Sequence, residues 1–206
     1  SYAGAYLVKR GRFLMSELPE VLGPDIARKG VERLNLIQIL ERAVTPDPGT
    51  PYARVAALES SLYLRNQLLR DMDWASMAHS LEVRSPFLSK RVVELAFSIP
   101  ASLKIRGRTS KAPLRLLATR YLPASHALLP KRGFHAPIDE WFRGELRGPF
   151  ESDVLGAGDG EIPWIDLSAV RRIWLAHQAR ATDSGATLWA LWALAAWTRT
   201  MKAPAS

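Results

Sequence analysis

Positively charged side chains gather in one segment of this sequence, where they suggest the binding of an anion. Residues 104–132 include eight lysine and arginine residues and no aspartate or glutamate. The remaining 20 basic residues are balanced by 20 acidic ones, so the net charge of +8 comes from this segment. A helix that begins at Ser110 would add free backbone N–H groups for the same anion, and the alternative is a basic face that only meets solvent. The eight are Lys104, Arg106, Arg108, Lys111, Arg115, Arg120, Lys131 and Arg132.

Lys131 and Arg132 end this segment, between an apolar run and Gly133. A lysine near an apolar wall on a glycine-containing loop can clamp a phosphate or act as a general acid. The alternative is an exposed loop lysine with no special role.

Two further pairs of charged residues could do chemistry. Glu82 and Arg84 are two positions apart in a segment expected to be extended, so both point to one face, as a structural ion pair or as a pair that orients a substrate. Asp71 and Asp73 could hold Mg²⁺. The reading favoured for them is structural, with Asp73 as the N-cap of a short helix and Asp71 paired with a nearby arginine.

Several classes of site are excluded by composition and spacing. The chain has no cysteine, so a cysteine nucleophile, a disulfide scaffold and thiolate metal sites are ruled out. No two of the four histidines are three or four residues apart, which disfavours a local zinc site. Neither a G-x-S-x-G nucleophile elbow nor a phosphate-binding glycine loop occurs.

The elements that must position these residues are mostly helices, and we expect one domain without an internal boundary. No run of alternating β-branched residues indicates a strand. The longest uncharged apolar stretch, residues 188–197, is shorter than the roughly 20 residues of a membrane span. Apolar spacing and capping residues predict helices over 31–44, 55–71, 74–79, 90–98, 110–121, 167–179 and 187–201, a loop and then a short helix within 136–147, an extended piece over 83–87, and loops over 45–52 and 151–163.

Three blocks in one order carry a resemblance to a known family. They are "LYLRNQLLRDMDWASMAHSLEVRSPFL", "GRTSKAPLR" and "PKRGFHAPIDEWFRGELR". Together they resemble the C-terminal part of the synthetase domain of glutamine-hydrolysing asparagine synthetases, most clearly over residues 55–147. "SYAGAYLVKRGRFLM" is more weakly similar to a segment farther upstream in that domain.

The resemblance implies an ATP-dependent amide-forming ligase. Such enzymes activate the side-chain carboxylate of aspartate with Mg-ATP as an acyl-adenylate, which ammonia from glutamine then attacks to give asparagine, AMP and pyrophosphate. Lys131 matches a family lysine that serves near the phosphates and the tetrahedral centre. The substrate- and phosphate-binding candidates are Glu82, Arg84, Lys111, Arg115 and Arg132, of which Glu82 and Arg84 match the S-x-E-x-R-x-P-x-L pattern, and Lys111 and Arg115 the K-x-x-L-R block.

Four departures from the family pattern are visible. The "SGG-x-D" pyrophosphate loop and the acidic "G-E-G-x-D-E" piece are absent, and so is an N-terminal glutaminase with its cysteine nucleophile. Ser89 stands where the family usually has aspartate. We therefore expect a helical C-terminal half of an α/β adenine-nucleotide-hydrolase-like synthetase domain, which is inactive alone. Its expected partners are the ATP-loop half and the glutaminase of one cytoplasmic protein, with ATP and Mg²⁺ as cofactors and no membrane.

Two other functions stay open at this point. A related synthetase could close an amide within one molecule, as β-lactam-forming and lasso-peptide-cyclising enzymes do. A basic helical module could instead bind nucleic acid, with an affinity that falls steeply with salt. Only Tyr121 adds an aromatic ring to the basic segment, so a base-stacking groove is not indicated.

Overall fold

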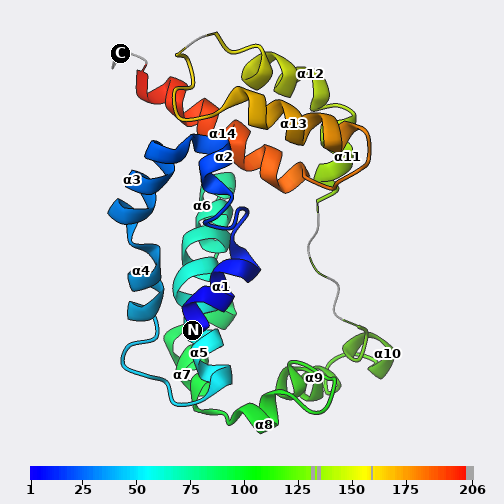
Figure 1. The fold of residues 1–206 in the computed structure, drawn as a ribbon. Coiled ribbons are helices and arrows are strands. Elements are labelled where there is room, and N and C mark those ends of the chain that lie inside the picture. Colours follow the sequence, from blue (N-terminus) through cyan, green and yellow to red (C-terminus); the bar gives the residue numbers. More distant parts are fainter. Residues whose placement is uncertain (131–132, 134–135, 159, 203–206) are drawn as a thin grey trace. The chain divides into compact units, whose positions relative to one another are not determined.

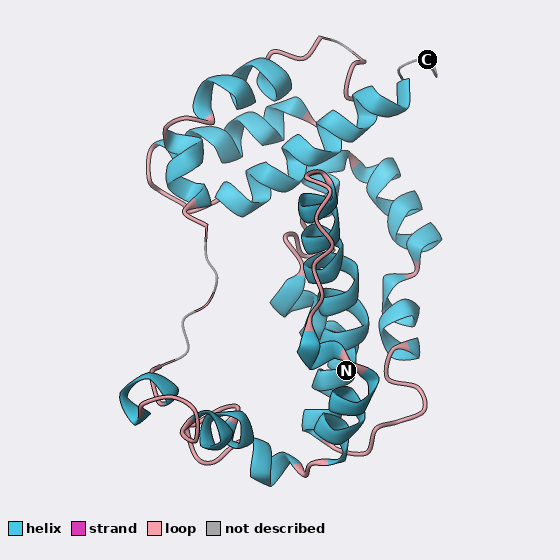
Figure 2. Cartoon of the chain, turned by 180° about the vertical axis from the view of Figure 1, so that it is seen from behind, coloured by secondary structure: helices cyan, strands magenta, loops and turns pink. Residues whose placement is uncertain are grey.

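The regular secondary structure of the described residues is helical. The computed structural model describes residues 1–206 apart from 131–132, 134–135, 159 and 203–206 (Figure 1). Within the described residues there is no strand, only an isolated bridge between Arg106 and Thr109 (Figure 2). The mostly helical fold predicted from the sequence is therefore confirmed.

The elements are α1 (Tyr2–Arg10), α2 (Leu18–Leu22), α3 (Pro24–Leu34), α4 (Leu36–Arg42), α5 (Pro51–Leu58), the π-helix η1 (Glu59–Leu68), α6 (Leu69–Met77), the 3₁₀-helix η2 (Pro86–Leu88), α7 (Lys90–Ser98), α8 (Ala101–Lys104), α9 (Ala112–Ala118), α10 (Ala124–Ala127), α11 (Ile138–Arg143), α12 (Arg147–Phe150), the π-helix η3 (Glu151–Leu155), α13 (Leu167–Gln178) and α14 (Gly185–Lys202).

The chain divides into two compact units. The first unit comprises residues 1, 3–39 and 135–206, and the second unit comprises residues 2 and 40–134. The chain passes from one unit to the other between residues 39 and 40 and again between 134 and 135, and the sequence analysis identifies no boundary at either place. That both units belong to one synthetase-type domain stays a prediction.

The first unit is built around an aromatic core. Phe142 of α11 and Phe150 of α12 are fully buried, with ring centroids 5.4 Å apart in an edge-to-face arrangement. Trp174 of α13 stacks on Phe150 at 4.8 Å. Leu188 and Leu191 of α14 close this cluster. Aromatic side chains bury more apolar surface than other residues, so this cluster can hold four short helices together.

Side-chain caps fix where the helices of the first unit begin. The Asp166 carboxylate accepts hydrogen bonds from the N–H groups of Ser168 and Ala169, at 2.8 and 3.1 Å, and starts α13. The Ser168 hydroxyl also donates to this carboxylate, and its bond, together with the two N–H bonds, lowers the pKa of Asp166. The carboxylate of Asp139, on α11, accepts from the N–H of Gly185 at 2.7 Å and so fastens the start of α14 to α11.

Arg143 joins α11 to the connection between α13 and α14. Its side chain is 9% exposed. The guanidinium donates to the carbonyls of His177 and Thr182, each at 3.1 Å, and to the carboxylate of Asp183 at 2.6 Å. The same guanidinium pairs with Glu140 at 3.1 Å. Four acceptors on one cation fix the path of a connection that has no regular structure of its own.

His177 lies under this connection and is fully buried. Its Nδ1 accepts a hydrogen bond from the N–H of Ser184 at 3.1 Å. The other ring nitrogen, Nε2, therefore donates to the carbonyl of Asp139, also at 3.1 Å. The bond at Nδ1 requires that this nitrogen carry no proton, because a protonated Nδ1 would face the N–H of Ser184.

The second unit is dominated by one long helical rod. Thr50 caps α5 by accepting from the N–H of Ala53 at 3.1 Å, and Pro51 sits in the first turn. The backbone then stays helical through η1 and α6 to Met77. In this unit Leu40 and Leu58 are the hydrophobic residues that count as buried among those described. The second unit thus has little apolar core.

Several helix boundaries predicted from the sequence are confirmed, and others are wrong. Helix α7 covers residues 90–98 as predicted. The extended piece predicted over 83–87 is confirmed at Ser85 but wrong at Pro86 and Phe87, which belong to η2. The predicted helix over 31–44 is broken at Asn35, whose φ of 44° is left-handed. The loop predicted over 151–163 begins instead with the helical turn η3.

Asp73 is not an N-cap, because α6 runs through it without a break. Its carbonyl oxygen accepts a hydrogen bond from the hydroxyl of Ser76 at 3.2 Å. Asp71 is two positions away on the same helix, so the two carboxylates do not face each other. Among the described residues, no group of three or more histidine and acidic residues is placed to hold a metal ion.

We predict that Phe142→Ala lowers the free energy of unfolding of the first unit by about 3–5 kcal/mol, because it leaves a cavity among three aromatic rings. Urea denaturation followed by tryptophan fluorescence measures this, since six of the seven tryptophans lie in the first unit. Leu175→Ala on α13 is the control: Leu175 is 66% exposed, so its loss should change stability by less than about 0.5 kcal/mol. Equal effects of the two substitutions would contradict the assignment of the core.

We also predict that acid weakens the Arg143 cluster. Hydrogen bonding and attraction to Arg143 hold the pKa of Asp183 below its ordinary value, and Arg180 and Arg143 do the same for Glu140. Carboxyl groups with lowered folded-state pKa values stabilise the fold above the ordinary pKa, and this contribution is lost as the pH falls through the lowered value. The urea midpoint should therefore drop below about pH 4.

Asp183→Asn should lower the midpoint at neutral pH and make it less sensitive to acid. Asp25→Asn is the matched control, because Asp25 is 85% exposed and 3.6 Å from its arginine partner. If Asp183→Asn kept the full acid sensitivity of the unaltered chain, the cluster would not be its source.

Candidate functional site

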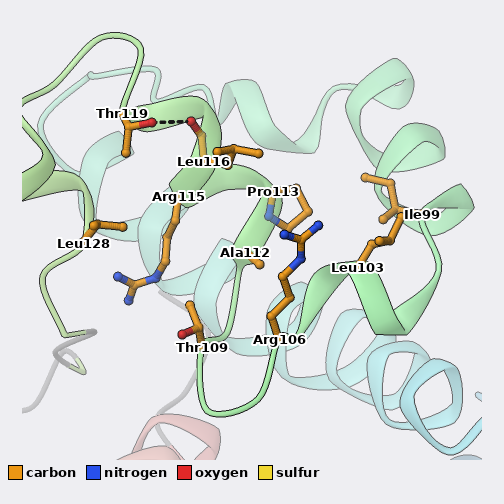
Figure 3. Close-up of a pocket in the computed structure, with 10 residues that line it drawn as sticks. All are labelled: Ile99, Leu103, Arg106, Thr109, Ala112, Pro113, Arg115, Leu116, Thr119 and Leu128. Atoms are coloured by element: carbon orange, nitrogen blue, oxygen red, sulfur yellow. Dashed lines mark hydrogen bonds between the residues drawn. The ribbon is translucent and has the colours of Figure 1, made fainter.

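The basic segment folds around a pocket in the second unit. Helix α8, the turn that follows it, α9 and the residues after α10 form its walls (Figure 3). The pocket has a volume of about 570 Å³. Its aliphatic lining comes from Ile99, Leu103, Ala112, Pro113, Leu116 and Leu128, and its polar lining from Arg106, Thr109, Arg115 and Thr119.

Arg115 is half-buried in α9 and binds the chain itself. Its Nε donates to the carbonyl of Ser110 at 3.1 Å, and its Nη1 donates to the carbonyl of Leu129 at 2.7 Å. The two carbonyls flank α9 and α10 in the sequence, so one guanidinium holds both ends of this region. Leu129 is two residues ahead of Lys131. Arg115 is thus placed to position the chain that leads to Lys131, and a contact of Arg115 with a phosphate stays a prediction.

Lys111 is the residue from which α9 starts. Its φ of 58° is left-handed, which is costly for a residue with a side chain. Ser110 was expected in this place, so the prediction of the cap residue is wrong by one position. The carbonyl of Lys111 accepts the N–H of Arg115 at 3.0 Å, and its exposed side chain has no hydrogen bond or ion pair within the described residues. The ammonium group is available to an anion.

Lys104 makes a different use of its charge. Its Nζ lies 5.1 Å from the centre of the Tyr52 ring and 5.9 Å from that of Phe97. These cation–π contacts tie α8 to α5 and α7. Lys104 is therefore committed to the fold of the second unit.

Glu82 and Arg84 form an ion pair, as their spacing predicts. Arg84 Nε donates to Glu82 Oε1 at 2.8 Å, in the non-helical stretch before η2. The side chains are 84% and 70% exposed. No hydrogen bond or ion pair joins them to α9 in the described part of the chain. The structure brings together the basic residues around α9 and leaves the Glu82–Arg84 pair separate from them.

Lys131 and Arg132 lie outside the described residues, so their predicted roles stay predictions. Arg106, which lines the pocket, was counted in the sequence only as one of eight charges. The sequence signal for the pocket region is a stretch without acidic residues, since no aspartate or glutamate occurs between Glu94 and Asp139.

Comparison with known proteins identifies the family of this chain. The family model described as asparagine synthase matches residues 6–199, which is nearly the whole chain. The chain belongs to the asparagine synthase family. The resemblance read from the three sequence blocks is therefore confirmed.

Curated relatives of this asparagine synthase family chain carry matching names. Proteins of Mycobacterium tuberculosis and Mycobacterium bovis that bear the name asparagine synthetase [glutamine-hydrolyzing] are 34% identical over 148 residues, which is 71% of this chain and 22% of the relative. Asparagine synthetase [glutamine-hydrolyzing] 1 of Bacillus subtilis is 29% identical over 135 residues, 66% of this chain and 21% of the relative. The chain thus spans about a fifth of the length of the curated relatives it matches. No solved structure matches it significantly.

None of the helices in the described residues is long and apolar enough to cross a lipid bilayer.

We predict that Arg84→Ala leaves the thermal melt unchanged, with the free energy of unfolding altered by less than about 0.5 kcal/mol, because an exposed ion pair contributes little. Arg54→Ala is the contrasting variant. Arg54 is 25% exposed, binds Asp47 at 2.6 Å and lowers the pKa of that carboxyl to about 2. Its loss should lower the melting temperature. A clear drop for Arg84→Ala would give the Glu82–Arg84 pair a structural role instead.

Proposed function

We propose that this chain is part of an ATP-dependent amide-forming ligase of the asparagine synthetase type. In that reaction a carboxylate of aspartate is adenylated, and ammonia released from glutamine displaces AMP to give asparagine. Membership of the asparagine synthase family and the names of the relatives support the proposal. The helical chain would then be the C-terminal half of an α/β adenine-nucleotide-hydrolase-like synthetase domain in a cytoplasmic enzyme.

The observation that carries the proposal is the grouping of cations around α9. Adenylation releases pyrophosphate, whose negative charge grows as it leaves, and fixed cations stabilise such a leaving group. Lys111 presents an uncommitted ammonium group at the start of α9. Lys131 and Arg132 follow the chain segment that Arg115 holds at Leu129. In this scheme Lys131 acts near the phosphates and the reacting carbon, and Arg115 is a positioning residue.

The cofactors fit the described residues unequally. The cations around α9 suit the phosphates of ATP, which would supply the adenylyl group. Among the described residues no acidic cluster suits Mg²⁺. We therefore assign Mg²⁺ no ligand in this part of the chain and route no step through it.

The second unit also exposes apolar side chains that another part of a protein could cover. Trp74, Phe87 and Leu95 are 63%, 65% and 62% exposed, while few of its apolar residues are buried. Apolar surface on this scale is typical of an interface. We assign it to the ATP-loop half and the glutaminase domain of the same enzyme. The chain alone should then form no amide.

The test is Lys131→Ala in the full-length enzyme, with ATP-dependent pyrophosphate release and glutamine hydrolysis measured side by side. We expect synthetase activity to fall by about 100-fold or more, the typical effect of removing one charge-stabilising group. Glutamine hydrolysis should persist, which shows that the protein is folded. The exposed Arg120 of the same basic segment provides the control, and Arg120→Ala should keep most of the activity. Unchanged synthetase activity in Lys131→Ala would remove Lys131 from the site.

A further inference from the structure

We propose that the pocket beside α9 is a binding site for a small organic acid, with an aliphatic body in the pocket and a carboxylate on Arg106. The inference rests on the pocket and its charges and does not depend on the amide-forming reaction.

The size and walls of the pocket suit a small molecule. At about 570 Å³ it falls within the range of roughly 300–1,000 Å³ that is usual for ligand sites. Leu103 of α8, Leu116 of α9 and Leu128 after α10 line it from three directions. Such walls bind an aliphatic body favourably, because apolar surface is buried when it enters and few polar groups have to be desolvated.

Arg106 supplies the polar contact and is held in place by a tight turn. Its N–H donates to the carbonyl of Thr109 at 3.0 Å, and the N–H of Thr109 donates back to the Arg106 carbonyl at 2.9 Å. Gly107 in this turn has a φ of 57°, a left-handed conformation that favours glycine. The turn fixes the Cα of Arg106 at the pocket, and its guanidinium has no hydrogen-bond or ion-pair partner within the described residues. Figure 3 shows the side chain running alongside Leu103 and Pro113.

The other arginine of the pocket cannot take this role. Arg115 already donates to two backbone carbonyls, and in Figure 3 its guanidinium is directed away from that of Arg106. Thr119 is likewise committed, since its hydroxyl donates to the carbonyl of Leu116 at 2.8 Å. The pocket therefore offers one free guanidinium, which matches a single carboxylate because two parallel N–H···O bonds fit its two oxygens.

The local charge favours an anion over a cation or a neutral molecule. The residues that line the pocket all fall within the stretch from 95 to 138, which has no aspartate or glutamate. A cationic head group would meet Arg106 with no carboxylate from this stretch to offset the repulsion. A neutral head group could accept a hydrogen bond but would leave the positive charge of Arg106 without a counter-charge.

The test compares three probes that share one aliphatic body: octanoate, octanol and octylammonium. The full 206-residue chain is labelled at isoleucine and leucine methyl groups, and each probe is titrated by nuclear magnetic resonance. We expect octanoate to shift the methyl signals of Ile99, Leu103, Leu116 and Leu128, and to bind about tenfold more tightly than octanol, because its carboxylate adds a charge-assisted contact with the exposed guanidinium. Octylammonium should not shift them.

Two charge-neutralising variants locate the head group. Arg106→Gln should weaken octanoate about tenfold and leave octanol unchanged. Arg108→Gln removes the same charge two residues away, outside the pocket lining, and should leave octanoate binding nearly unchanged.

Three results would overturn the proposal. They are equal binding of octanoate and octanol, an equal loss of octanoate affinity in both arginine variants, and shifts confined to methyl groups away from the pocket. Because Arg106 is exposed and its turn is held by backbone bonds, Arg106→Gln should fold normally. Its unaltered methyl spectrum without probe verifies this.

Discussion

This structure depends on hydrogen bonds from arginine guanidinium groups to main-chain carbonyls. Helix ends and the irregular connections between helices leave many carbonyl groups without main-chain partners. Arg143 satisfies the carbonyls of His177 and Thr182, and Arg115 satisfies those of Ser110 and Leu129. Arg171 does the same for Leu155 at 3.0 Å. The composition suits this role, since 21 of the 28 basic residues are arginine. Lysine, with a single ammonium group, cannot span two carbonyls in one plane.

These arginine–carbonyl hydrogen bonds contribute differently to the two units. In the first unit a well-packed aromatic core already stabilises the fold. The hydrogen bonds of Arg143 add to that stability by fixing the connection between α13 and α14. In the second unit few side chains are buried, and Arg115 is one of the main contacts between separate turns of chain. The same bond thus carries more of the local order where the core is weaker. The region around α9 is accordingly the part whose shape depends most on polar contacts.

The sequence predicted what is local and missed what is distant. Helix α7 was predicted residue for residue, because Ser89 and Pro100 bracket it. The three blocks identified the family, which the family match over residues 6–199 bears out. Three of the four acceptors of Arg143, on His177, Thr182 and Asp183, lie 34 to 40 residues away, and no spacing rule connects them with it. The break at Asn35 was missed because the apolar pattern continues across it and only one residue turns left-handed.

The candidate site divides in the same way. The ion pair of Glu82 and Arg84 was foreseen because the two residues are near neighbours, whereas its exposure depends on surroundings that a sequence does not display. The pocket was not foreseen at all, because α8, a turn, α9 and the end of α10 must come together to make it. Lys131 and Arg132 keep the roles that the resemblance gives them, as predictions.

The acid-free stretch around the pocket has a consequence for measurement. A guanidinium keeps its proton throughout the pH range in which proteins stay folded. The lining has no histidine, lysine or carboxyl group whose own charge would change over that range. The affinity of the pocket for an acid should then follow the ionisation of the acid itself. A measurement of the dissociation constant against pH would therefore give the pKa of the bound acid.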